Sequence, residues 1–140
     1  MASRSLIDAC HTEVTRLHAG QVVDDDPHTR QLLRIIFTRV GYEVIEAQDG
    51  LDALGQLETN CCPHLVILDV LMPNLDGFTT MHYIRANPQF ARLPVMMLSS
   101  RADVAAESIG LEAGAQDYLV KPFNLTTLLQ RVDYLIGMFN

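Results

Sequence analysis

Short apolar runs alternate with helical stretches along most of this sequence, and that alternation limits the folds it can adopt. Five runs are expected to be strands: residues 22–23, 44–45, 65–68, 94–98 and 118–120. The run 65–68, Leu-Val-Ile-Leu, is apolar on both faces, as a parallel strand covered by helices on both sides should be. Five strands alternating with helices favour an α/β fold, a doubly wound parallel sheet with helices on both faces.

The stretches between these runs have apolar residues at helical spacing. The first helix is expected to begin at Pro27, because proline is tolerated in a first turn, and to end at Gly41. Further helices are expected up to about Arg85 and from about Asp103 to Ala113. The apolar residues at helical spacing in the first, second and last helices are Leu33, Ile36, Phe37 and Val40; Leu51, Leu54 and Leu57; and Leu125, Leu128, Leu129, Val132, Ile136 and Phe139.

The first strand is the weakest of the five. Gly20 and Gln21 precede its apolar pair, and glycine inside a strand costs roughly 0.5–1 kcal/mol relative to alanine. A buried Gln21 would also need hydrogen-bond partners. We therefore expect this strand to be short or irregular.

Composition excludes several classes of function. A chain of 140 residues fits one domain, and its net charge of -7 makes it a poor partner for nucleic acid or for anionic membranes. No apolar run approaches the ~20 residues that span a bilayer. The three cysteines form no disulfide framework, and free thiols indicate a reducing compartment. We therefore expect a cytoplasmic protein without direct nucleic-acid or membrane partners.

Polar residues follow four of the expected strands. Asp24 and Asp25 follow the first strand, Asp69 the third, Ser99 the fourth and Lys121 the fifth. Ligands of doubly wound sheets bind beyond the carboxyl ends of the strands, so these side chains are expected to meet there.

Such a group of side chains has a definite chemistry. Clustered carboxylates raise one another's pKa or hold a cation, and a hard-oxygen site with few protein ligands suits Mg²⁺. A carboxylate in this setting can attack phosphorus and form an aspartyl phosphate. Ser99 and Lys121 can then hold the phosphoryl oxygens.

Three motifs occur in order along the chain: Val-Val-Asp-Asp-Asp-Pro at 22–27, Val-Ile-Leu-Asp-Val-Leu-Met-Pro-Asn-Leu-Asp-Gly at 66–77, and Gly-Ala-Gln-Asp-Tyr-Leu-Val-Lys-Pro-Phe at 114–123. Over roughly residues 20–139 the chain resembles the receiver domains of two-component response regulators, of the kind found in chemotaxis regulators. The resemblance implies a flavodoxin-like sheet with strand order 2-1-3-4-5. It also implies a magnesium-dependent signalling switch that has no independent substrate and is therefore not an enzyme in its own right.

The resemblance also implies residue roles. Asp69 matches the aspartate that accepts a phosphoryl group from a phosphohistidine of a sensor kinase or a phosphotransfer protein. The implied Mg²⁺ ligands are Asp24, Asp25, Asp69 and the backbone carbonyl of Leu71, with Asp25 favoured over Asp24 as a direct ligand. The implied catalytic residues are Asp69, Ser99 and Lys121, and the implied switch residues are Ser99 and Tyr118. The bond between Lys121 and Pro122 would be cis.

A downstream effector protein or domain is the implied partner for the switched surface. That surface would be formed by the helix at about 103–113, the strand at 118–120 and the last helix, and it could also pair with a second copy of the chain. Tyr134 and Met138 lie off the apolar stripe of the last helix and are candidate contacts. In the family, Leu71 and Arg101 would flank the path of the hydrolytic water.

Other interpretations remain to be separated from this one. The haloacid-dehalogenase phosphatases also use an aspartate nucleophile, but they carry a second acid where this chain has Leu71. Nucleotide-binding motifs are absent from the sequence. A receiver-like interaction domain that works without phosphorylation is the main alternative. The acids at 24–26 could also serve only as an N-cap for the Pro27 helix, and Tyr118 could be an ordinary core residue.

The domain organisation is expected to have two parts. Residues 19–140 form the receiver-like domain. Residues 1–18 form an N-terminal extension, expected to be helical because Leu6, Cys10, Val14 and Leu17 make an apolar stripe.

Overall fold

The computed structural model describes residues 18–59 and 62–139. The helix expected within residues 1–18 lies almost entirely outside the described residues, so that prediction stands untested.

Lys121 and Pro122 are joined by a cis peptide bond, as the family resemblance implied.

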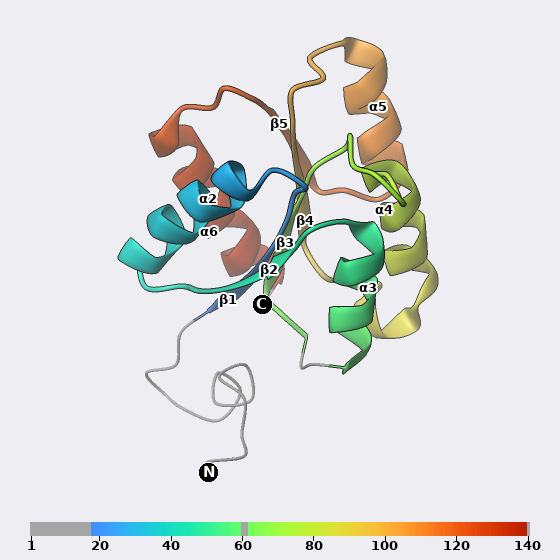
Figure 1. The fold of residues 1–140 in the computed structure, drawn as a ribbon, viewed down its shortest axis with the longest axis horizontal. Coiled ribbons are helices and arrows are strands. Elements are labelled where there is room, and N and C mark those ends of the chain that lie inside the picture. Colours follow the sequence, from blue (N-terminus) through green and yellow to red (C-terminus); the bar gives the residue numbers. More distant parts are fainter. Residues whose placement is uncertain (1–17, 60–61, 140) are drawn as a thin grey trace.

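The described chain forms a five-stranded parallel sheet in the order β2-β1-β3-β4-β5, which confirms the expected fold (Figure 1). The strands are β1 (Ala19–Val23), β2 (Glu43–Ala47), β3 (Leu65–Leu68), β4 (Val95–Ser99) and β5 (Asp117–Val120). Strands β1 and β3 lie at the centre, with Val23 of β1 paired to Leu68 of β3. The strand order reverses between β1 and β3, so the topological switch point of the sheet lies beside the residues that follow these two strands.

Helices cover both faces of this sheet (Figure 1). They are α2 (Pro27–Arg39), α3 (Gly50–Thr59), α4 (Gly77–Ala86), α5 (Val104–Glu112) and α6 (Leu125–Phe139), with a short 3-10 turn, η1 (Pro88–Phe90), after α4. Helices α2 and α6 pack on one face, where Leu33, Phe37, Leu128 and Val132 are buried against Ile67 of β3. Helices α3, α4 and α5 pack on the other face.

The first strand differs from the prediction. It is a regular strand of five residues, fully paired to β2 and β3, and Gln21 is buried within it. The Gln21 amide nitrogen donates to the Ala53 carbonyl and to the Gln56 side chain of α3, both at 3.1 Å. A Cβ on Gly20 would come no closer than 3.9 Å to the Leu65 carbonyl oxygen, so the glycine introduces no irregularity. The expectation was wrong because the strand is regular and α3 supplies acceptors for the Gln21 amide nitrogen, although Gln21 Oε1 is buried without a hydrogen-bond partner among the described residues.

Three of the residues expected in the apolar stripes of the helices are exposed. Leu51 is 58% exposed, because α3 turns Gly50, Ala53 and Leu57 toward the sheet instead. Val40 and Leu125 also lie at the surface, since each stands at a helix terminus. Tyr134 and Met138 are exposed, as their place off the stripe of the last helix predicted. No helix in the described part of the chain combines the length and apolar character needed to cross a membrane.

Candidate functional site at the carboxyl edge of the sheet

The fold brings the predicted site residues to one edge of the sheet. Asp24 follows β1 directly, Asp69 follows β3, Ser99 ends β4 and Lys121 follows β5. Backbone hydrogen bonds align these positions: Asp69 N donates to Val23 O at 3.0 Å, and Lys121 N donates to Ser99 O at 2.8 Å. Because the strands are parallel, side chains that are up to 97 residues apart in sequence meet in one place.

Three carboxylates form the centre of this site. Asp24, Asp25 and Asp69 each offer an oxygen within 4.8 Å of the others. Asp24 and Asp69 are buried, while Asp25 is exposed to solvent. This donor set of hard oxygens, open on the Asp25 side, fits a divalent cation that keeps part of its hydration shell.

Asp24 is held by contacts on both sides of its carboxylate. Its Oδ1 accepts a hydrogen bond from the Asp26 backbone N–H at 2.9 Å, and its Oδ2 accepts one from Lys121 Nζ at 2.7 Å. The Arg30 guanidinium donates to its backbone carbonyl at 2.7 Å. Asp24 is therefore fixed in orientation by contacts to both carboxylate oxygens and to its carbonyl.

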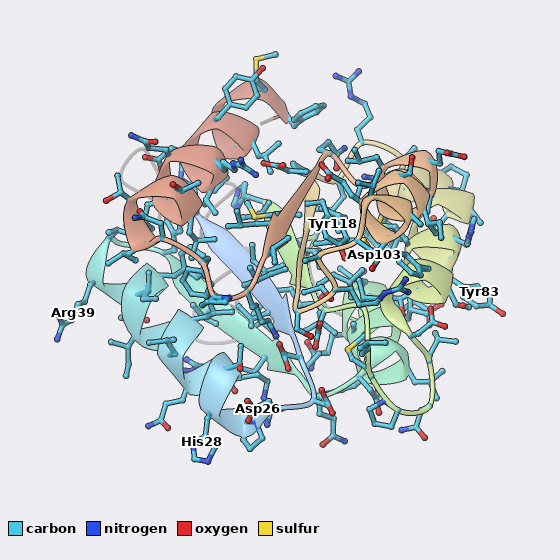
Figure 2. All side chains as sticks on the ribbon, turned by 90° about the horizontal axis from the view of Figure 1, so that it is seen from above. Asp26, His28, Arg39, Tyr83, Asp103 and Tyr118 are labelled. Carbon is cyan, nitrogen blue, oxygen red and sulfur yellow. The ribbon has the colours of Figure 1, made fainter. Side chains whose placement is uncertain are left out.

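Asp26 has a different task from its two neighbours. It is the N-cap of α2: its side chain accepts from the His28 backbone N–H at 3.0 Å and from the Thr29 hydroxyl at 2.9 Å. Figure 2 shows Asp26 and His28 at the surface, in the first turn of α2. The capping interpretation thus holds for one aspartate of the three, while Asp24 and Asp25 belong to the acid cluster.

Asp69 is a carboxylate in an environment that disfavours its charge. Burial, followed by the negative charge of Asp24, raises its pKa from 3.8 to about 6. Lys121 and a 2.8 Å hydrogen bond from the Val70 backbone N–H to its Oδ1 act in the opposite direction. A buried carboxylate surrounded by other acids gains from any cation that enters the site.

Lys121 stands between two of the acids. Its Nζ lies 2.7 Å from Asp24 Oδ2 and 3.7 Å from Asp69 Oδ2. Burial alone would lower the pKa of this ammonium, but the hydrogen bond to Asp24 and the charge of Asp69 outweigh it, and the pKa is raised. Lys121 therefore carries a positive charge beside the Asp69 carboxylate.

Ser99 and Tyr118 occupy the β4 and β5 side of the site. The Ser99 hydroxyl is buried and accepts the Arg101 backbone N–H at 3.2 Å. Tyr118 is buried against the sheet, and its hydroxyl donates to the Arg101 carbonyl at 2.8 Å. Figure 2 shows Tyr118 near Asp103 on the α5 side of the molecule. In this structure the Tyr118 ring is thus in an inward position.

Leu71 and Arg101 have defined surroundings. The Leu71 side chain is 56% exposed in the loop after Asp69. The Arg101 guanidinium makes two hydrogen bonds to Asp103, of 3.0 and 3.3 Å, and Asp103 in turn caps α5. Arg101 would have to leave Asp103 before it could contact a phosphoryl group on Asp69.

Gly77 also belongs to the site, although in the sequence it stands out only as the last residue of the motif at 66–77. A Cβ at this position would lie 2.1 Å from the backbone carbonyl oxygen of Asp69, so only glycine allows α4 to begin this close to Asp69. The preceding residue, Asp76, is the N-cap of α4, with its carboxylate accepting from Thr79 N at 2.8 Å. The Asp-Gly pair in the sequence was the available signal, but it does not reveal which backbone group the glycine approaches.

Comparisons with known proteins agree with this geometry. The family model of the response regulator receiver domain matches residues 21–133. The chain belongs to this family. Among solved structures, a chain described as a putative response regulator from Chloroflexus aurantiacus matches with a TM-score of 0.82 and 39% identity, over 86% of this chain and 98% of that one.

A second receiver structure bears on the metal. The receiver domain of a sensor histidine kinase from Pseudomonas aeruginosa PAO1 matches with a TM-score of 0.80 and 28% identity, over 86% of this chain and 98% of that one. That structure holds a magnesium ion in its active-site cleft. Among curated proteins, the response regulator MprA of Mycobacterium sp. (strain KMS) is 44% identical over 115 residues, or 82% of this chain and 49% of that protein. The chain spans about half the length of the curated relatives it matches.

Proposed function

We propose that this receiver domain is switched by phosphorylation of Asp69, with a phosphohistidine of a sensor histidine kinase or of a phosphotransfer protein as the donor. The observation that supports this most directly is the position of Asp69 itself. It is a buried carboxylate with a pKa of about 6, flanked by two acids and by the Lys121 ammonium 3.7 Å away. Family membership supports the same reaction class.

The reaction is proposed to require Mg²⁺. Carboxylate oxygens of Asp24, Asp25 and Asp69, together with the backbone carbonyl of Leu71, are the groups that would hold the ion, with Asp25 as the most accessible direct ligand. Bound Mg²⁺ would neutralise the charge of the incoming phosphoryl group and polarise it. The magnesium ion in the related Pseudomonas receiver structure supports this assignment.

Asp69, Lys121 and Ser99 would each have a separate role in phosphoryl transfer. A carboxylate oxygen of Asp69 attacks phosphorus, an O–P bond forms, and the N–P bond to the donor imidazole breaks with its electron pair returning to the ring nitrogen. Lys121 Nζ moves from Asp24 to a phosphoryl oxygen, a short displacement because it already lies between the two acids. The Ser99 hydroxyl holds a second phosphoryl oxygen.

The output would be a change in the surface formed by α5, β5 and α6. Ser99 moving toward the phosphoryl group would change its contact with Arg101 N, and Arg101 O is the acceptor for the Tyr118 hydroxyl. Phosphorylation at Asp69 would thereby affect Tyr118, whose backbone carbonyl accepts from Arg131 of α6 at 3.4 Å, and α6 carries the exposed residues Tyr134 and Met138. The partner would be a downstream effector protein or domain, or a second copy of this chain.

We also propose that the chain has two parts. Residues 19–140 would be the receiver domain, and residues 1–18 an extension of separate role. The protein would be cytoplasmic and would act as a switch without an independent substrate.

Acetyl phosphate provides the test. We expect intact-mass analysis to show one added phosphoryl group in the presence of Mg²⁺, and none with EDTA, with Asp25→Ala or with Asp69→Asn. Labelling that persists in Asp69→Asn would overturn the assignment of the acceptor. No labelling of the wild-type chain under any condition would instead favour the alternative, a receiver-like interaction domain that works without phosphorylation.

A further inference from the structure

The loop of residues 70–76 connects the proposed acceptor to α4 and contains Leu71, a proposed cation ligand through its carbonyl. The beginning and end of the loop are joined by a hydrogen bond from Gly77 N to Val70 O at 2.8 Å. This bond leaves the residues between them to be fixed by other contacts. The Leu71 side chain does not supply such a contact, since it is largely exposed.

Asn74 supplies one. Its backbone has a φ of 70°, in the left-handed region that most residues avoid and asparagine tolerates. Its side-chain Nδ2 donates a hydrogen bond of 2.7 Å to Oδ2 of Asp49, which is 25 residues away in the connection between β2 and α3. The loop after the acceptor is thus held from a neighbouring segment of the chain.

Asp49 is a well-fixed anchor. Its side chain is buried, and its Oδ1 accepts the Asp52 backbone N–H at 2.8 Å in the first turn of α3. Its backbone carbonyl accepts from Ala53 N at 3.0 Å. The hydrogen bonds from Asp52 N and from the Asn74 amide lower the pKa of this carboxyl group. Asp49 therefore stays ionised and in place at neutral pH.

The two segments also meet at close range beside this hydrogen bond. A Cβ on Gly50 would lie 2.9 Å from the Leu75 carbonyl oxygen and 2.0 Å from the Thr80 hydroxyl oxygen. The start of α3 therefore blocks the loop from moving toward it, while the Asn74 side chain prevents the loop from moving away. Together these contacts define the position of the loop.

From these contacts we infer that Asp49 and Asn74 are a positioning pair that sets the Mg²⁺ affinity of the site, a role that rests on the proposed function. Mg²⁺ demands near-octahedral geometry, so a carbonyl ligand that is displaced with its loop binds the ion less well. The loop is closed at its ends by the bond from Gly77 to Val70 and is held at Asn74 by Asp49. Leu71 lies between the two attached residues, Val70 and Asn74. Neither Asp49 nor Asn74 is part of the acid cluster itself.

Three variants test the pair. Asn74→Gly keeps access to positive φ and removes the amide, but glycine also increases the freedom of the loop backbone, so the next two variants are needed to isolate the hydrogen bond. Asn74→Asp places a second carboxylate against Asp49. The double variant Asp49→Asn with Asn74→Asp restores a donor and an acceptor with their roles exchanged, and the amide oxygen introduced at position 49 can still accept from Asp52 N.

The readout is the Mg²⁺ dissociation constant from calorimetry, beside the urea unfolding midpoint of each variant. We expect Asn74→Gly and Asn74→Asp to weaken Mg²⁺ binding by roughly fivefold or more, the factor that one lost hydrogen bond corresponds to. The double variant should return to within about twofold of wild type. Asn87→Gly is the matched control, because it removes a hydrogen bond of 3.0 Å to Gln89 N at the opposite edge of the sheet. It should change stability without changing Mg²⁺ affinity.

The outcomes separate this inference from the proposed function. Suppose that the wild-type chain binds Mg²⁺ and that Asn74→Gly binds it with equal affinity, or Asn74→Asp binds it more tightly. Either result would overturn the positioning role and leave the proposed function intact. Failure of the double variant to recover affinity would also count against the pair. A wild-type chain that binds no Mg²⁺ at all would overturn the proposed function instead.

Discussion

At the scale of single residues, Asp69 couples stability to pH. Its pKa is raised from 3.8 to about 6 because burial and the Asp24 charge disfavour the carboxylate. The folded state therefore binds a proton more tightly than the unfolded chain. The resulting stabilisation is complete below about pH 4 and is lost as the pH rises through about 6, a difference on the order of 3 kcal/mol.

Asp69→Asn removes this titration while keeping the shape of the side chain. In urea unfolding without divalent cations, we expect the variant to gain stability relative to wild type as the pH rises from about 4 to about 8. Adding Mg²⁺ should reduce the difference at high pH, because the ion offsets the repulsion only in the wild-type site. A difference that does not vary with pH would mean that Asp69 titrates as it does in the unfolded chain.

Leu71 is the residue whose side chain is expected to influence the lifetime of the phosphorylated form. It has no hydrogen-bonding group with which to align an attacking water, and it is bulky. Leu71→Asn should therefore speed phosphate loss by roughly fivefold, the effect of one hydrogen bond of about 1 kcal/mol. The measurement is the decay of the phosphorylated mass after removal of the donor.

Arg101 is the second residue of this prediction. Arg101→Glu should also shorten the lifetime, since it removes a cation that could leave Asp103 for the phosphoryl group. Unchanged decay in both variants would show that neither residue controls water access or product stability.

At the scale of secondary-structure elements, two helical glycines make opposite predictions. Gly77→Ala should destabilise the domain by roughly 1–3 kcal/mol, because its Cβ would meet the Asp69 carbonyl at 2.1 Å where α4 begins. Gly55→Ala in α3 should stabilise it by about 0.5–1 kcal/mol, since nothing lies within 4 Å of that Cβ. Urea unfolding of the two variants side by side checks both signs. Equal changes in the free energy of unfolding for the two variants would show that the close approach of Gly77 to the Asp69 carbonyl does not determine the sign of the effect.

The elements also show what a sequence can reveal. The five strands and the polar residues after them were predictable, because period, turn residues and strand ends are local properties of the chain. The length of β1 was not, since Gln21 obtains its partners from Ala53 and Gln56, more than 30 residues away. The exposure of Leu51 was missed for a similar reason: small residues, Gly50 and Ala53, form the buried face of α3.

The same distinction applies to the site. Asp24, Asp25, Asp69, Ser99 and Lys121 could be placed together from the topology alone, because parallel strands deliver their carboxyl ends to one edge. The pairing of Asn74 with Asp49 could not, since it depends on the path of a loop and on a φ of 70° at one residue. The resemblance had already separated Asp24 and Asp25 from Asp26, but only the structure shows that Asp26 is the N-cap of α2.

At the scale of the whole molecule, phosphorylation is expected to change one face and leave the rest unaltered. Beryllofluoride, a phosphoryl mimic, should alter amide hydrogen exchange in α5, β5 and α6 relative to α3, because Ser99, Arg101 and Tyr118 connect the site to that face. Exchange that stays unchanged over residues 101–139 would contradict the two-state switch.

The same face offers a test of self-association. Ile109, Leu111, Tyr134 and Met138 are exposed there. If a second copy is the partner, beryllofluoride should increase the dimer fraction in sedimentation, and Met138→Glu should reverse the increase. A monomer under both conditions would leave an effector of different sequence as the partner.

The strand direction has one further consequence, which concerns the space around the molecule. His18 joins the sheet where β1 begins, its carbonyl accepting from Glu43 N at 2.8 Å, and α6 returns the chain to that same side at Phe139 (Figure 1). The acid cluster lies at the opposite side, where the strands end. A phosphoryl donor that docks over the acid cluster would therefore approach the edge of the sheet that lies opposite the two boundaries of the described domain.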